Sequence, residues 1–354
     1  MGRFLIQLFA HHDREKVETI AYASVRKPDA ITNRLRESCD CWVDALGMSD
    51  EALAERVRDD RIDILVDLTM HMRDQRLLCF ARRPAPIQAT YLAYCSTTGL
   101  DAINYRLTDP YLDPPGERDA WYVERSMRLP ESYWCYEPGI PTPEVNPLPA
   151  ARRGYITFAS LNNFCKVSPA ALSLWSQLLA QTPHSRLLLH AHRGAHRQRV
   201  LDLFALRGVL PQRIVFVDTV SLAEYFALYQ LVDIALDTFP YAGGTTTCDA
   251  LWMGVPVISL VGDPAFTRGG LSILSNVGLA RFATRSPEKY LEEAAELASD
   301  LPRLAELRAT LRIRLQQSPV MNGPRFAAGL EACYRSMWTR WLIDPVSKPI
   351  VRQV

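Results

Sequence analysis

The sequence predicts an α/β protein with two doubly wound domains on either side of a proline-rich linker. Short apolar runs typical of buried parallel strands alternate along the chain with longer amphipathic segments typical of helices. Five prolines fall between residues 136 and 154, and proline resists both helix interiors and central strands. At roughly 150 residues per domain, the 354 residues suffice for two domains. Alternating strand and helix units on both sides of the linker therefore predict two domains that face a cleft.

The half before the linker contains three predicted strands and one well-marked helix. Residues 18–23, 62–68 and 87–94 are the expected strands, of which 62–68 is a mostly apolar run suited to a parallel sheet. Residues 49–60 are the expected helix, because a serine or aspartate can cap its start and acidic residues occupy its first turn.

The half after the linker alternates regularly. Ser168 followed by Pro169 is typical of a helix N-cap with proline at the first helical position. The expected strands are residues 155–161, 185–190, 213–217, 234–237 and 255–261, and the expected helices are residues 168–181, 198–208, 222–231 and 246–253. Residues 287–341 are expected to be mostly helical.

Charge and cysteine usage exclude several classes of protein. Forty Lys and Arg oppose 39 Asp and Glu, so the near-neutral chain lacks the broad basic surface of a protein that binds nucleic acid or an anionic membrane. No run of about 18 apolar residues predicts a membrane span. The eight cysteines form no CxxC pair and are expected to be reduced thiols, and no signal-peptide cleavage pattern follows the first residues. We therefore expect a cytoplasmic protein.

A glycine and threonine-rich segment, residues 237–249, is the strongest candidate binding site. An acidic residue ends a strand, Gly243 and Gly244 allow close backbone approach, and Thr245 and Thr246 open a helix. Free amides at a helix start bind anions, and this arrangement suits a diphosphate. The alternative is an ordinary strand-to-helix turn with a threonine cap.

A second candidate segment, residues 160–169, follows the end of an expected strand. Lys166 can balance charge that develops on a leaving phosphate, and the neighbouring asparagine amides can orient oxygens. The alternative is an exposed loop lysine beside turn-forming asparagines.

The histidines give weaker signals. His71 follows the strand that ends near Asp67, so it can point into the cleft as a base or a donor. Four histidines between residues 184 and 196 match no helical metal-binding spacing, and we expect no metal site. No GxSxG or GxxxxGK[ST] motif indicates a serine hydrolase or a P-loop kinase.

The motifs resemble the catalytic region of the protein O-GlcNAc transferases and the related SPINDLY proteins, the glycosyltransferase family 41 type. The resemblance extends nearly from end to end, and the order of RPAPIQ, NNxxK and PYxGGTTTC is highly specific. The matching segments are HHDREK (11–16), RIDILVDLT (61–69), ARRPAPIQATYLAY (81–94), TTGL (97–100), YRLTDPYLDPPG (105–116), RLPESYWCY (128–136), TFASLNNFCKVSP (157–169), DIALDTFPYAGGTTTCDALWMGVPVISL (233–260) and SPVMNGPRF (318–326).

The resemblance implies a GT-B fold, in which two Rossmann-like domains face a cleft. It assigns residues 1–136 to an N-terminal, acceptor-side domain, 137–154 to the linker and 155–325 to a C-terminal, donor-binding domain. Residues 326–354 are expected to form a helix that packs back on the N-terminal domain. Because family members usually begin with a strand that precedes HHD, the N-terminal domain is expected to lack its first strand, and residues 3–10 to expose apolar surface that favours self-association.

The resemblance also implies a function and residue roles. We expect inverting, metal-independent transfer of GlcNAc from UDP-GlcNAc to Ser or Thr hydroxyls of proteins, without a cofactor. Lys166 is expected to neutralise the leaving diphosphate and His71 to act as the base. The expected substrate-binding residues are Asn163 near the phosphates, Gly243, Gly244, Thr245 and Thr246 around the diphosphate, and Asp249 at the ribose.

Departures from the family pattern leave alternatives open. The usual GHT motif reads Met70-His71-Met72, a usual histidine is Tyr225, and the family's substrate-recruiting helical repeats are not found among these residues. One alternative is a GDP-fucose-dependent protein O-fucosyltransferase. Another is a truncated, inactive domain that binds a nucleotide sugar, and a third is a different GT-B enzyme such as a UDP-GlcNAc epimerase.

Overall fold

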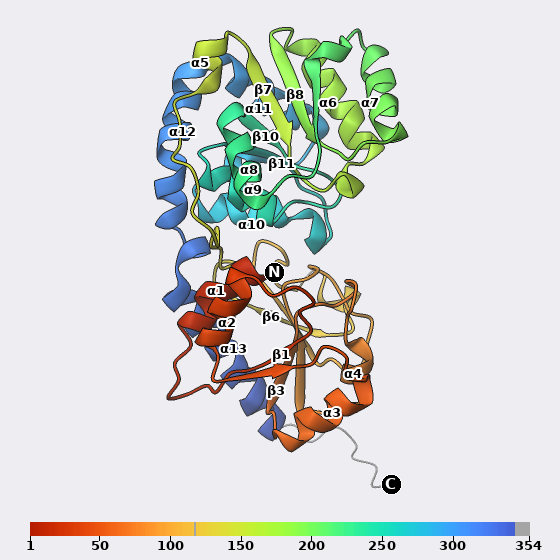
Figure 1. Ribbon diagram of the computed structural model, residues 1–354, viewed down its shortest axis with the longest axis vertical. Helices are drawn as coiled ribbons and strands as arrows, with labels where there is room; N and C mark the ends of the chain where they lie inside the picture. Colours follow the sequence, from red (N-terminus) through yellow and green to blue (C-terminus); the bar gives the residue numbers. More distant parts are fainter. Residues whose placement is uncertain (117, 344–354) are drawn as a thin grey trace. The chain divides into compact units, whose positions relative to one another are not determined.

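A computed structural model describes residues 1–116 and 118–343. It divides the chain into two compact units (Figure 1). The first unit comprises Met1–Gly139 and resumes at Met321, and the second is Ile140–Val320. The sequence places these boundaries at residues 136 and 325. The expected linker contains a short helix, α5 (Pro149–Arg153), and residues 344–354 of the expected last helix lie outside the described residues.

The first unit contains two groups of parallel strands. One group pairs β1 with β2, and the other is a four-stranded sheet in the order β3-β4-β5-β6. The strands are β1 (Ile20–Ala23), β2 (Cys41–Asp44), β3 (Ile64–Asp67), β4 (Ile87–Thr90), β5 (Tyr105–Thr108) and β6 (Arg125–Arg128). The predicted strand 87–94 ends at Thr90, because Leu92 adopts a φ of 78° that a strand does not accommodate.

Helices of the first unit complete its core. Ser49 caps α3 as predicted, since its hydroxyl accepts the amide of Ala52 at 3.2 Å. Leu53 and Val57 of α3 pack in one buried cluster with Leu65 of β3. The helices are α1 (Gly2–Ala10), α2 (Ala30–Ser38), α3 (Asp50–Asp59), α4 (Leu77–Ala81) and α13 (Gly323–Ile343), with a 3-10 turn η1 (Asp119–Trp121).

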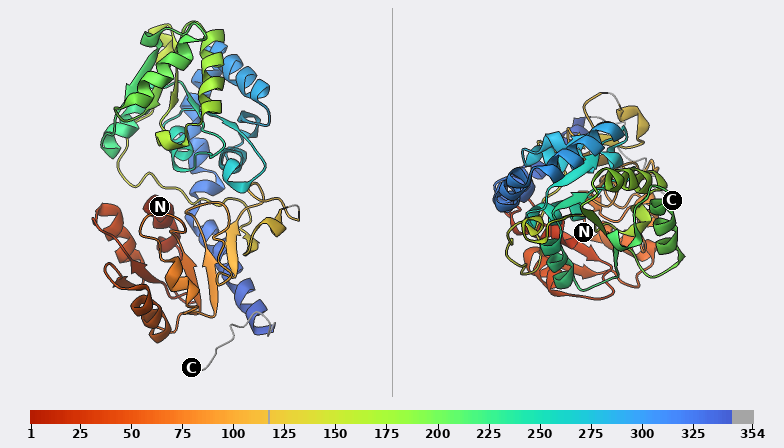
Figure 2. Two further views of the ribbon diagram at one scale, coloured as in Figure 1. Left: turned by 90° about the vertical axis from the view of Figure 1, so that its right-hand side faces the viewer. Right: turned by 90° about the horizontal axis from the view of Figure 1, so that it is seen from above.

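Helix α1 is not an exposed apolar segment, which corrects the expectation for residues 3–10. Phe4, Leu5, Ile6 and Leu8 are all buried. The helix packs on α2 and α13, and Figure 2 shows α13 running along the first unit. The reason that the sequence offered for self-association is therefore wrong.

The second unit is built on one six-stranded parallel sheet in the order β12-β11-β10-β7-β8-β9. Five of its strands fall within the predicted runs. They are β7 (Ile156–Ser160), β8 (Ser185–His190), β9 (Ile214–Val217), β10 (Ile234–Leu236) and β11 (Val257–Leu260), and β12 (Ala283–Thr284) was not predicted.

The helices of the second unit pack on this sheet, with α10 and α11 against β11 and α6 against β8. Ser168 caps α6 and Pro169 opens it, as predicted. Helix α7 begins three residues earlier than expected, and the predicted helix 222–231 tightens into the 3-10 turn η4 at its end. The helices are α6 (Pro169–Gln181), α7 (Ala195–Ala205), α8 (Leu222–Leu228), α9 (Thr245–Trp252), α10 (Gly269–Asn276), α11 (Pro287–Ser299) and α12 (Leu301–Gln316). The 3-10 turns are η2 (Phe164–Lys166), η3 (Pro211–Arg213), η4 (Tyr229–Leu231), η5 (Ala265–Thr267), η6 (Ala280–Phe282) and η7 (Pro319–Met321).

Candidate active site

The candidate site lies at the carboxyl edge of the second unit's sheet, where the strand order reverses. From β7 the chain adds β8 and β9 on one side, and it then returns to add β10, β11 and β12 on the other. Ligands of open parallel sheets bind outside the carboxyl ends of the strands at such a reversal. The loop after β7 leads to Lys166 and the loop after β10 to Gly243, so both predicted motifs meet at this edge.

Lys166 turns its ammonium group towards the glycine loop. Its Nζ donates to the carbonyl oxygen of Ala242 at 3.4 Å and lies 4.1 Å from the ring centroid of Tyr241. Both partners directly precede Gly243. The positive charge therefore lies beside the bend that the sequence assigned to a diphosphate, as the two motifs together predicted.

Gly243 occupies a position that has no room for a side chain. A Cβ atom there would lie 2.6 Å from Thr246 Oγ1, 2.8 Å from Asp237 Oδ1 and 2.9 Å from Thr247 Oγ1. Each distance is shorter than the contacts that real Cβ atoms make. The absence of a side chain at Gly243 therefore lets the loop lie directly against the first turn of α9.

The start of α9 is suited to an anion. Gly244 is the N-cap residue of α9, and as a glycine it has no side chain to cap the amides that begin at Thr245. The positive end of the helix dipole adds to these donors. The hydroxyl of Thr247 is buried and has no hydrogen-bond partner among the described residues. Among the described residues, the start of α9 therefore has amides that Gly244 does not cap and a buried hydroxyl without a partner, and it follows the glycine loop that Lys166 contacts.

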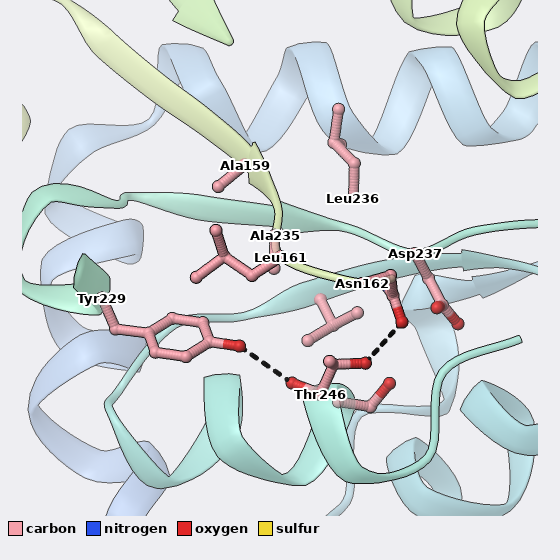
Figure 3. A pocket seen from close by; sticks show the side chains of 10 residues that line it. Ala159, Leu161, Asn162, Tyr229, Ala235, Leu236, Asp237 and Thr246 are labelled. Atoms are coloured by element: carbon pink, nitrogen blue, oxygen red, sulfur yellow. Dashed lines mark hydrogen bonds between the residues drawn. The ribbon is translucent and has the colours of Figure 1, made fainter. Parts of the chain in front are cut away.

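The two asparagines have different positions, and the predicted Asn163 is not the one that contacts α9. Asn163 is exposed, and its side chain accepts the amide of Cys165 at 3.2 Å as the cap of η2. Asn162 is buried and accepts the hydroxyl of Thr246 at 2.6 Å (Figure 3). The structure thus brings Asn162 to the threonines, a residue that the sequence motif contained but did not distinguish.

Asp237 holds the glycine loop and was not predicted as a site residue. It follows β10 and is buried. Its Oδ1 accepts the amides of Gly243 at 2.7 Å and Thr238 at 2.9 Å, and its Oδ2 accepts the Ser259 hydroxyl at 2.7 Å. Burial raises the pKa of Asp237 to about 6, although these hydrogen bonds and the charge of Lys166 oppose the rise. An acidic residue directly after a buried strand and before two glycines was the available sequence signal.

Asp249, the predicted ribose-binding residue, lies inside the protein. It is fully buried within α9, and the Tyr225 side chain hydrogen-bonds to it. Burial, with the Asp249 charge adding to it, raises the pKa of Tyr225 well above its ordinary value. Tyr229 joins Tyr225 at 2.8 Å between hydroxyl oxygens and donates to the carbonyl of Thr246 at 3.2 Å. The ribose-binding role of Asp249 stays a prediction. In that role, its carboxylate would bind the ribose as well as Tyr225.

His71 belongs to the first unit and is described there alone. It is exposed, and it follows the turn that Asp67 and Met70 form after β3. Its Nε2 lies 3.3 Å from the carbonyl oxygen of Thr97, and its ring lies 6.4 Å from that of Tyr94 between centroids. The base role stays a prediction.

Other histidines of the second unit lie near the same sheet edge. The ring of His196 packs against Phe164 of η2 with 4.8 Å between centroids, and His192 contacts Asp218 at 3.0 Å. Within the described ranges, no group of three or more His, Cys, Asp and Glu side chains is placed to hold a metal ion. None of the described helices has the length and apolar character that a bilayer span requires.

Comparison with known proteins identifies the family. The profile described as Glycosyl transferase family 41 matches residues 3–137 and 148–330. The chain belongs to glycosyltransferase family 41. The family that the motifs indicated is thereby confirmed.

Named relatives of this family 41 chain include plant proteins. It is 40% identical over 346 residues to a tomato (Solanum lycopersicum) protein named probable UDP-N-acetylglucosamine--peptide N-acetylglucosaminyltransferase SPINDLY, covering 96% of this chain and 37% of the relative. A relative from Arabidopsis thaliana with the same name is 39% identical, with 96% and 38% covered. The chain therefore spans less than two fifths of the length of these relatives.

Solved structures support the same family and the GT-B fold. A mutant of the Thermobaculum terrenum O-GlcNAc transferase is 38% identical with a TM-score of 0.89, covering 96% of this chain and 65% of that chain. Sucrose-phosphate synthase from Thermosynechococcus elongatus has a TM-score of 0.58 at 14% identity, covering 94% of this chain and 92% of that chain, which shows likeness of fold alone. The predicted GT-B class is confirmed.

Proposed function

We propose that this chain transfers GlcNAc from UDP-GlcNAc to Ser or Thr hydroxyls of proteins, with inversion at the sugar carbon. Family membership and the names of the relatives support a nucleotide-sugar donor and a protein acceptor. The observation that carries the proposal is the position of Lys166, whose ammonium group lies against the glycine loop at the uncapped start of α9.

The proposed chemistry follows from where charge develops. The bond between the sugar C1 and the diphosphate oxygen breaks, and that electron pair stays on the leaving UDP. The acceptor oxygen bonds to C1 from the opposite face and loses its proton to a base. Lys166 and the α9 amides, fixed before the reaction, stabilise the leaving charge, and a strong preorganised donor of this kind contributes roughly 3–4 kcal/mol.

The remaining parts of the proposal concern the base, metal independence and the compartment. We assign the base to His71, whose exposed ring an acceptor can reach. Transfer is proposed to need no metal, because Lys166 and the helix amides supply the positive charge, and transfer in excess EDTA tests this. A cytoplasmic location is proposed because the eight cysteines are free thiols.

A donor panel tests the function. The chain is incubated with a mixed Ser/Thr peptide library and either UDP-GlcNAc or GDP-fucose, and the peptide masses are measured. We expect addition of one N-acetylhexosamine with UDP-GlcNAc alone. Addition of a deoxyhexose from GDP-fucose would overturn the donor assignment. Binding of UDP without any transfer would overturn the enzymatic proposal in favour of a binding domain, and isomerisation of the sugar without an acceptor would favour an epimerase.

A further inference from the structure

Two loops of the first unit, one that leads into His71 and one that contacts its ring, are each folded around a buried carboxylate. The first is the turn after β3. Asp67, 2% exposed, accepts the amides of Thr69 and Met70, each at 3.0 Å. Met70 adopts a φ of 42°, a left-handed conformation that is uncommon for a residue with a side chain. The carboxylate of Asp67 therefore fixes the backbone from which His71 projects.

The second loop comprises residues 97–100 and folds around Glu124, which directly precedes β6. Glu124 is 2% exposed. Its carboxylate accepts the hydroxyl of Thr97 at 2.7 Å, the amide of Thr98 at 2.6 Å and the hydroxyl of Thr98. The Thr97 hydroxyl in turn accepts the amide of Gly99 at 3.0 Å. Side-chain and backbone groups of this loop thus depend on one carboxylate, because removing it would leave buried donors unsatisfied.

The contact between this loop and His71 favours one position for the imidazole proton. Nε2 of His71 lies 3.3 Å from the carbonyl oxygen of Thr97. A carbonyl oxygen can only accept a hydrogen bond, so this contact stabilises the neutral ring that holds its proton on Nε2. Nδ1 then bears the lone pair. A backbone carbonyl that fixes the tautomer in this way is a common device for setting which nitrogen reacts.

We propose that Glu124 is a positioning residue that acts through Thr97 to hold neutral His71 as its Nε2–H tautomer. Nδ1 is then the atom that takes the proton of the acceptor hydroxyl. Only this last step rests on the proposed function, because the tautomer is a property of the unliganded first unit. The carboxylate of Glu124 accepts hydrogen bonds from Thr97 and Thr98, so its effect on His71 passes through the loop backbone.

Nuclear magnetic resonance of the full chain with ¹⁵N-labelled histidine tests the tautomer directly. Long-range proton–nitrogen correlations are recorded at a pH where the rings are neutral, and the His71 signals are identified by their loss in His71→Asn. We expect wild-type His71 to show a protonated Nε2 and an unprotonated Nδ1. Nitrogen shifts of His71 that indicate a mixture, or a proton on Nδ1, would overturn the proposal.

Two variants and a matched control separate positioning from a general structural effect. Glu124→Gln and Thr97→Val each remove part of the link while leaving the Thr97 carbonyl in the chain, and both are expected to shift His71 towards a mixture of tautomers. Glu55→Gln makes the same chemical change as Glu124→Gln at an exposed site on α3 and should leave the His71 shifts unchanged. His71 shifts identical to wild type in both test variants would contradict the role of Glu124.

Transfer kinetics of the variants distinguish a failure of this inference from a failure of the proposed function. We expect Glu124→Gln to lower kcat on the order of tenfold, with KM for UDP-GlcNAc within about twofold, because a misplaced base affects the chemical step more than donor binding. Undiminished transfer by His71→Asn would remove His71 as the base. The nitrogen spectra would still decide which tautomer His71 adopts. An unchanged kcat in Glu124→Gln together with altered His71 shifts would overturn the assignment of Nδ1 as the proton acceptor.

Discussion

Asn162 Oδ1 lies 2.6 Å from Thr246 Oγ1, which joins the loop after β7 to the first turn of α9 (Figure 3). These residues are 84 positions apart in the sequence. The hydrogen bond ties the two loops that carry Lys166 and Gly243, so the cation and the helix start are held as one arrangement. Because Asn162 is buried, water does not compete strongly for this hydrogen bond.

Substitution of the two asparagines should therefore have unequal effects. Asn162→Ala leaves the Thr246 hydroxyl without its partner, and we expect UDP affinity to fall about tenfold, which corresponds to one buried hydrogen bond of roughly 1–1.5 kcal/mol. Asn163→Ala removes an exposed cap and should change affinity less than about threefold. Isothermal calorimetry with UDP measures both. Equal losses, or a larger loss in Asn163→Ala, would contradict the placement of Asn162.

Gly243→Ala tests the close approach of the loop to α9. The added Cβ would meet three oxygen atoms between 2.6 and 2.9 Å away, so the loop must move from α9 and from the Asp237 carboxylate. We expect UDP binding to fall more than about 100-fold, since small displacements in a preorganised site are costly. Circular dichroism and the Tm check that the fold persists. Wild-type affinity in a folded variant would show that the loop conformation is unimportant.

The buried carboxylate of Asp237 predicts a pH dependence of stability. Its pKa is raised from 3.8 to about 6, so the folded state binds this proton more tightly than the unfolded chain. Its contribution to the free energy of unfolding is therefore greatest below about pH 4 and is lost as pH rises to about 6, by on the order of 3 kcal/mol.

Asp237→Asn should lack this part of the pH profile. Urea unfolding of the wild type and the variant between pH 4 and pH 7 gives the difference in stability at each pH, in which the other titrating groups largely cancel. We expect the stability of the variant relative to wild type to increase as pH rises from about 4 to 6 and then to level off. A pH-independent difference would show that Asp237 has an ordinary pKa.

Loss of the Arg308 side chain of α12 is expected to destabilise the second unit strongly. Arg308 is buried, and its guanidinium donates to the carbonyl of Asn146 at 2.7 Å and to that of Val232 at 2.7 Å. Arg308→Met leaves the buried carbonyl of Val232 and the partly buried carbonyl of Asn146 without this donor, and we expect a loss of about 3–5 kcal/mol. Arg314→Ala, at a partly exposed site on the same helix, should cost less than about 1 kcal/mol. Denaturant unfolding compares the two, and similar costs would contradict the account.

The sequence was most informative where local chemistry and fold coincide. The run from β10 through Gly243 and Gly244 to α9 could be predicted because an apolar strand, a glycine pair and a run of threonines that opens a helix follow one another. The sequence could not predict which of Asn162 and Asn163 points inwards, because the loop after β7 has neither strand nor helix periodicity. Asp237 was missed because its role depends on Gly243 and Ser259, which the fold rather than the sequence brings to it.

The sequence also failed to reveal β5, a strand that contains a buried charge. β5 contains Arg106, which is 1% exposed and would normally argue against a buried strand. Its guanidinium donates to Asp113 at 2.8 Å and to Ser126 at 3.0 Å, and it stacks on Tyr122. These partners follow it by seven to twenty residues, so no local pattern reveals that the charge is compensated.

Steady-state transfer kinetics of Lys166→Ala test the central claim most directly. The claim is that the Lys166 ammonium group, held against Ala242 and Tyr241, stabilises the charge of the leaving diphosphate. We predict that kcat for transfer from UDP-GlcNAc falls about 10²- to 10³-fold while the Tm stays near wild type. Lys27→Ala, at an exposed site, is the matched control and should retain full activity. A kcat for Lys166→Ala within about threefold of wild type would contradict the account.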